Sequence, residues 1–151
     1  MLVRIKKDGS GREPLTTVPF LEKGNVSPDG KWVTVFSADG LLAVPLHAGA
    51  ARKICPAPCR AVWASDGRFF YVHGDRRTSA ASPGKTLAIP VPAGESLPEL
   101  PASGIDMSAG GIQLPGTRVI EHGSLSPGRD PSTYVFTRTD LQRNLFRIPL
   151  H

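Results

Sequence analysis

The chain lacks the long apolar runs of membrane proteins, since no stretch approaches the roughly 18 to 20 residues of a membrane-spanning helix. Its first eight residues, 1–8, also lack the apolar centre of a signal peptide. We therefore expect a water-soluble piece of protein with no membrane insertion in this chain. The compartment stays open on this evidence, with a lean toward an extracytoplasmic domain of a larger protein.

Sequence motifs of catalysis are missing as well. No Gly-x-Ser-x-Gly nucleophile elbow occurs. The segment 82–86 contains Gly-Lys-Thr, but Ser79 stands where a phosphate-binding loop requires its first glycine. The histidines are single and far apart: His47, His73, His122 and His151. Since no constellation forms, we predict that the chain is not an enzyme and has no catalytic, cofactor-binding or metal-binding residue.

Cysteine is scarce, with only Cys55 and Cys59 in the chain. Two cysteines cannot fill a four-ligand zinc site, and no histidine pair at metal spacing accompanies them. Two readings stay open: a pair of buried free thiols, which we favour, and a local disulfide, which the prolines at 56 and 58 restrict. A disulfide would imply an extracytoplasmic setting.

Positive charge is in excess but is not concentrated. The formal net charge is +5, and the sequence pI is about 9.6. The lysines and arginines are scattered, and no alternation of basic and aromatic residues resembles an RNA-binding sheet. Basic residues on strand edges, where they discourage edge-to-edge pairing, account for them. We predict no nucleic-acid partner.

Glycine and proline are abundant, at 16 and 15 of 151 residues, in a chain that is 40% hydrophobic. The hydrophobic content is that of a globular domain, and the chain is long enough to bury one core. So many turn-forming residues leave little room for long helices. The composition predicts an all-β fold of short strands joined by turns.

One turn-strand unit organises the chain. Ser27-Pro28-Asp29-Gly30-Lys31 is a turn sequence that leads directly into the β-branched and aromatic stretch 32–36. A second copy, Ser65-Asp66-Gly67-Arg68, leads into 69–72, and Asp29 and Asp66 are 37 positions apart. A degenerate third copy is expected at 124–129, with Gly128 in place of the aspartate.

Further landmarks repeat in the same register. Gly9, Gly49 and Gly94 mark a second kind of turn, at intervals of 40 and 45 positions. Between the turns we expect strands at 2–5, 14–18, 31–37, 41–46, 52–55, 61–64, 68–73, 86–91, 133–137 and 144–150. The chain is expected to cross over at 19–25 without a strand, and the glycine-rich segment 101–123 is expected to be irregular.

The turn Ser27–Lys31 with its apolar strand, and its second copy at 63–68, resemble the repeat of TolB-type, WD-repeat-like β-propellers. The resemblance implies a partial β-propeller of four-stranded antiparallel blades, with about two full blades and two partial ones. The resemblance divides the single domain into five parts. These are the end of a preceding blade at 1–18, full blades at 19–59 and 60–100, an irregular insertion at 101–123 and a partial terminal blade at 124–151.

The propeller resemblance implies a non-catalytic binding or sensing module that contacts a protein or small ligand through blade-edge loops. The rim of Asp-Gly turns and the Gly74–Gly84 loop are the expected contact sites. The closing stretch 142–150 resembles the tail of bacterial multidomain proteins. The alternative is therefore an accessory propeller of a larger enzyme, a serine/threonine kinase or peptidase, whose catalytic domain lies outside this chain.

Closing a propeller ring takes about four blades or more. Two full and two partial blades do not complete such a ring. The chain is therefore expected either to be a fragment of a larger propeller, which we favour, or to assemble with another copy of itself.

Overall fold

The computed structural model describes residues 2–16, 19–56, 59–74, 84–107, 114–123 and 125–136. Within these ranges the chain forms strands and no helix, so it offers no helix that could cross a membrane. The strands are β1 (Leu2–Arg4), β2 (Glu13–Thr16), β3 (Glu22–Val26), β4 (Trp32–Ser37), β5 (Gly40–Pro45), β6 (Arg52–Cys55), β7 (Cys59–Trp63), β8 (Phe69–Gly74), β9 (Thr86–Pro90), β10 (Arg118–Ile120), β11 (Leu125–Pro127) and β12 (Tyr134–Phe136). The predicted all-β class is confirmed.

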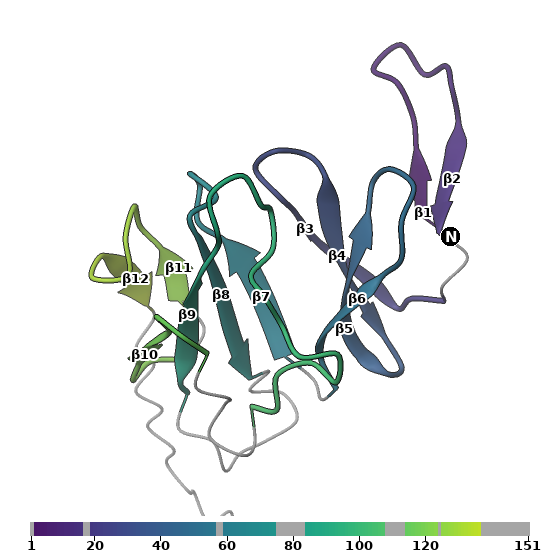
Figure 1. The fold of residues 1–151 in the computed structure, drawn as a ribbon. Coiled ribbons are helices and arrows are strands. Elements are labelled where there is room, and N and C mark those ends of the chain that lie inside the picture. Colours follow the sequence, from purple (N-terminus) through teal and green to yellow (C-terminus); the bar gives the residue numbers. More distant parts are fainter. Residues whose placement is uncertain are drawn as a thin grey trace, which may run out of the picture.

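The strands form a row of antiparallel sheets (Figure 1). Two sheets have four strands each, in the orders β3-β4-β5-β6 and β7-β8-β9-β10. The pair β1–β2 lies beside the first of these sheets, and the pair β11–β12 lies beside the second. Within each sheet, strands that follow one another in the sequence lie side by side. Short turns join most of them, whereas the connections from β8 to β9 and from β9 to β10 are longer.

Apolar side chains on both faces of the four-stranded sheets hold the row together. The largest cluster joins the two sheets, with Leu41 and Ile54 from the first packing with Phe70 and Leu87 from the second. Tyr71, on the opposite face of β8, belongs to a cluster that includes the β11–β12 pair. Alternation along each strand therefore buries both faces, which explains the apolar runs in β4, β5, β8 and β9.

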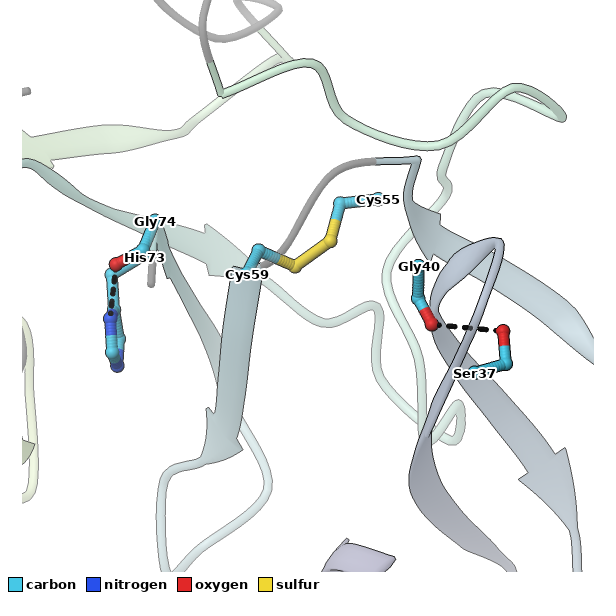
Figure 2. Close-up of a disulfide and its surroundings, with 6 residues drawn as sticks. All are labelled: Ser37, Gly40, Cys55, Cys59, His73 and Gly74. Carbon is cyan, nitrogen blue, oxygen red and sulfur yellow. Dashed lines mark hydrogen bonds between the residues drawn. A yellow bond between two sulfur atoms is a disulfide. The ribbon is translucent and has the colours of Figure 1, made fainter. Parts of the chain in front are cut away.

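A disulfide connects the two four-stranded sheets at one end (Figure 2). Cys55 ends β6 and Cys59 begins β7, and their Cα atoms are 6.5 Å apart. Both cysteines are buried. The reading of two free thiols was therefore wrong, because the short connection brings both side chains into the same core.

Strand β3 lies where the sequence predicted only a crossing segment. Its residues, Glu-Lys-Gly-Asn-Val, show no apolar alternation, and most of them are exposed. It pairs with β4 from Glu22 to Val26 with a register shift between Lys23 and Val26. Backbone pairing and not side-chain burial defines this strand, so a hydrophobic pattern could not predict it.

Two other strands differ from the expectations. β10 lies inside the segment 101–123 that was predicted to be irregular, so the second sheet extends to Ile120 and not to position 100. β11 occupies 125–127, where a turn was expected, and the turn itself follows it. The strand expected at 144–150 lies outside the described residues.

Candidate functional site

Three turns with the same hydrogen-bond pattern join the first and second strands of successive sheets. In each, the amide of the first turn residue donates to the carbonyl oxygen five positions later: Ser27 to Trp32 at 2.8 Å, Ala64 to Phe69 at 2.9 Å and Gly128 to Thr133 at 2.8 Å. These turns connect β3 to β4, β7 to β8 and β11 to β12. The repeat read from the sequence thus has a structural counterpart in all three turns.

An aspartate stands at the same place in each turn. Its carboxylate accepts the amide two residues later: Asp29 from Lys31 at 3.1 Å, Asp66 from Arg68 at 3.1 Å and Asp130 from Ser132 at 2.9 Å. The prediction that Gly128 replaces the third aspartate was wrong by two positions. Since Gly128 begins its turn as Ser27 begins the first, Asp130 is the counterpart of Asp29.

The three aspartate turns lie along the upper end of the sheets in the view of Figure 1. Between the first two turns is a hollow of about 190 Å³, which we call the rim pocket; it is lined by residues 28–29, 63, 66–68 and 91–96. Its walls combine apolar groups, such as Trp63 and Val91, with the carboxylates of Asp29, Asp66 and Glu95. Two repeats and the β9–β10 connection therefore share one concave surface.

Asp29 connects the two four-stranded sheets at this pocket. Its carboxylate accepts the hydroxyls of Ser96, on the β9–β10 connection, and of Ser27, at 2.7 Å. Lys31 adds an ion pair at 3.4 Å. Burial raises the pKa of Asp29, but the hydrogen bonds from Ser96, Ser27 and Lys31 outweigh it and hold the pKa well below its usual range. The carboxylate is thus ionised and engaged at neutral pH.

Ser96 forms hydrogen bonds with residues of both four-stranded sheets. Its hydroxyl donates to Asp29, and its carbonyl oxygen accepts the indole N–H of Trp63 at 2.7 Å. Trp63 is buried at the end of β7, with its ring centroid 4.9 Å from that of Phe70. No sequence motif singles out Ser96, because a serine in a connection becomes informative only when the fold brings its hydrogen-bond partners to it.

The other two turn aspartates are held within their own turns. A backbone and a side-chain hydrogen bond from Arg68 lower the pKa of Asp66, and the Arg68 Nε–Asp66 Oδ2 distance is 2.6 Å. The hydroxyl and then the amide of Ser132 lower the pKa of Asp130. All three carboxylates therefore serve as turn acceptors.

We predict that Asp29→Asn lowers the free energy of unfolding by about 1 kcal/mol at pH 7, since it replaces charged hydrogen bonds by neutral ones on a partly exposed group. A lowered folded pKa stabilises the fold above the unfolded value of about 3.9, and this stabilisation is lost as the pH falls through the folded pKa. The difference from wild type should therefore shrink in acid. Urea unfolding across that pH range measures it.

Asp66→Asn is the matched control, because it removes the same turn carboxylate without touching a second sheet. We expect this substitution to change stability less than Asp29→Asn. Equal effects of the two substitutions would contradict a bridging role for Asp29.

A second hollow lies along the first strands of three sheets. It measures about 340 Å³ and is lined by residues 22–25, 36, 60–62, 73 and 125–127. These positions include β3, β7 and β11, the first strand of each successive sheet. Asn25 of β3 donates to the carbonyl of Ala61 in β7 at 3.3 Å, so these first strands also contact one another directly.

The predicted contact sites fall into two groups. The Asp-Gly turns lie together at the rim pocket, whereas most of the Gly74–Gly84 loop, residues 75–83, lies outside the described residues. No group of three or more His, Cys, Asp or Glu side chains in the described ranges is placed to hold a metal ion. His73 lies in the second hollow, and His122 stacks on Phe136 at 4.0 Å between ring centroids.

Comparison with known proteins adds no relative. No family model matches the chain, and no curated protein or solved structure is significantly similar to it.

Proposed function

We propose that this chain is part of a TolB-like β-propeller and acts as a non-catalytic module that binds a protein or peptide at the rim pocket. The observation that carries the proposal is the aspartate turn that occurs three times. Equivalent turns between the first and second strands of successive sheets, on one rim, are the arrangement of propeller blades.

The first strands support the propeller arrangement independently. In a propeller the corresponding strand of every blade faces the central channel. Here β3, β7 and β11 line one common hollow, although they belong to three different sheets. Phe36 of β4 and His73 of β8 complete the lining of this hollow. Sheets packed as a simple sandwich would give no reason for the first strands of three sheets to line one hollow together.

The state of the rim carboxylates supports binding rather than catalysis. A general acid or base needs a pKa near the working pH and a reachable proton. Asp29, Asp66 and Asp130 instead have lowered pKa values and accept hydrogen bonds from their own turns. The rim therefore presents turns held by their own hydrogen bonds, with apolar and acidic surface, and loops of this kind often bind partners.

The disulfide bears on where such a module would work. Disulfides persist in oxidising compartments and are rare in the cytosol. The Cys55–Cys59 disulfide therefore favours an extracytoplasmic setting for this module.

The proposal can be tested by selecting short peptides that bind the whole chain from a displayed random library. We expect selected peptides to lose at least about tenfold in affinity on Ala93→Trp, because the indole would fill the rim pocket that Ala93 lines. Ala48→Trp is the matched control, since Ala48 is an exposed alanine in the equivalent turn after β5 and does not line the pocket.

The outcome can contradict the proposal in two ways. If no selected peptide responds to Ala93→Trp, the rim pocket is not the binding surface. If Ala48→Trp weakens the same peptides equally, the effect of Ala93→Trp is not specific to the pocket.

A further inference from the structure

We propose that the rim pocket takes the cationic side chain of a lysine or an arginine from the bound protein or peptide. This inference rests on the proposed function and adds to it the chemistry of the residue that the partner presents. Every residue that lines the rim pocket belongs to the described ranges.

The charge of the rim pocket is opposite in sign to that of the whole chain. The chain has a formal net charge of +5. The pocket lining, in contrast, carries the carboxylates of Asp29, Asp66 and Glu95 and one guanidinium, that of Arg68. The pKa values of Asp29 and Asp66 are lowered because their hydrogen bonds outweigh burial, so both stay ionised at neutral pH. A local excess of negative charge attracts a cation and repels an anion.

The Glu95 carboxylate has no balancing cation among the described residues. Asp66 pairs with Arg68 at 2.6 Å, and Asp29 pairs with Lys31 at 3.4 Å. Within the described part of the chain, the side chain of Glu95 makes neither an ion pair nor a hydrogen bond. Both of its oxygens are therefore available to a guanidinium or an ammonium group that comes from a partner.

The backbone segment that carries Glu95 is held at both ends. At one end, the amide of Val91 donates to the carbonyl oxygen of Arg68 at 2.9 Å. At the other end, Ser96 directly follows Glu95 and is fixed by its hydrogen bonds to both four-stranded sheets. Because the segment is in place before a partner arrives, binding costs less conformational entropy.

The rest of the lining is largely apolar and the pocket is small. Pro28, Trp63, Val91 and Pro92 contribute to its walls. Lysine and arginine pack their methylene stems on such surface while the charged end stays in a polar environment. At about 190 Å³, the pocket is smaller than the roughly 300 to 1,000 Å³ of small-molecule sites. It therefore fits one side chain better than a cofactor.

The arrangement of the carboxylates does not suit a bare metal ion. In the described ranges, no group of three or more His, Cys, Asp or Glu side chains is placed to hold one. Asp29, Asp66 and Glu95 therefore do not converge on a single point, as the ligands of Ca²⁺ or Mg²⁺ do. Carboxylates spread along a partly apolar hollow match an elongated cation with an apolar stem.

The peptides selected on the whole chain test the inference. We expect every peptide that responds to Ala93→Trp to contain a lysine or an arginine, although the positive net charge of the chain favours acidic peptides. Replacing that arginine by citrulline, or that lysine by acetyl-lysine, removes the charge and keeps the stem. This replacement should weaken binding at least about tenfold.

Glu95→Gln tests the same contact from the side of the chain. It should weaken the same peptides at least about fivefold and make their binding less dependent on salt. Glu99→Gln is the matched control, because Glu99 is an exposed carboxylate on the same connection and does not line the pocket. Both substitutions change the net charge equally, so a difference between them reports the contact and not the overall charge.

The outcomes separate this inference from the proposed function. Peptides that respond to Ala93→Trp but bind equally well without a positive charge overturn the inference and leave the rim function standing. Equal effects of Glu95→Gln and Glu99→Gln also overturn it. If no peptide responds to Ala93→Trp, the proposed function fails, and the inference fails with it.

Discussion

Gly40→Ala is expected to lower the free energy of unfolding by about 3 to 5 kcal/mol, as the sum of backbone strain and steric overlap. Gly40 begins β5 with φ of 114°, a conformation that residues with a side chain rarely adopt. A Cβ atom there would lie 2.1 Å from the carbonyl oxygen of Cys55. This oxygen belongs to the backbone beside the disulfide, so it cannot easily move away (Figure 2).

Gly30→Ala is the control for this prediction. Gly30 also has a positive φ, of 70°, in the first aspartate turn, but a Cβ atom there would meet nothing within 4 Å. Only backbone strain remains, and we expect a loss of about 1 kcal/mol. Urea unfolding of both variants separates strain from overlap. Similar losses for both would contradict the close approach of the β4–β5 turn to Cys55.

Trp63→Ala is expected to destabilise the chain by about 3 to 5 kcal/mol, as other deletions of buried aromatic side chains do. The indole fills space between the two four-stranded sheets and also holds the β9–β10 connection through Ser96. Trp63→Phe should retain most of the packing and lose the hydrogen bond, at a cost of about 1 to 2 kcal/mol. Denaturant unfolding monitored by circular dichroism measures both.

Trp32 supplies the comparison, because it is only partly buried at the start of β4, where Arg52 lies 5.4 Å from its ring. Trp32→Ala should therefore cost less than Trp63→Ala. If the two substitutions were equivalent, Trp63 would not be the side chain that joins the sheets at the rim pocket.

The sequence predicts those parts of the fold that local residues determine. The turns at Gly30 and Gly67 follow from Asp-Gly, which supplies the positive φ values of 70° and 73°. Strands β4, β5, β8 and β9 follow from apolar runs because both faces of their sheets are buried. Within these elements, local preference and tertiary packing agree.

The parts of the fold that the sequence did not predict depend on residues far away in the chain. β3 is an exposed edge strand held by backbone pairing to β4, and β10 joins its sheet only after a connection of more than twenty residues. Asp130 was missed because proline and not glycine follows it, which hides its likeness to Asp29. Of the candidate site, the sequence predicted the aspartate rim, but neither Ser96 nor the pocket beside it.

The rotation between successive sheets is the most direct test of the propeller arrangement. It can be measured on a crystal structure of residues 1–151 by superposing β3–β6 on β7–β10 and then β7–β8 on β11–β12. A closed ring of about four to eight sheets predicts that both superpositions share one axis and one rotation, of about 45° to 90°. Two unrelated axes, or sheets packed as a sandwich at about 30° without a common axis, would contradict it.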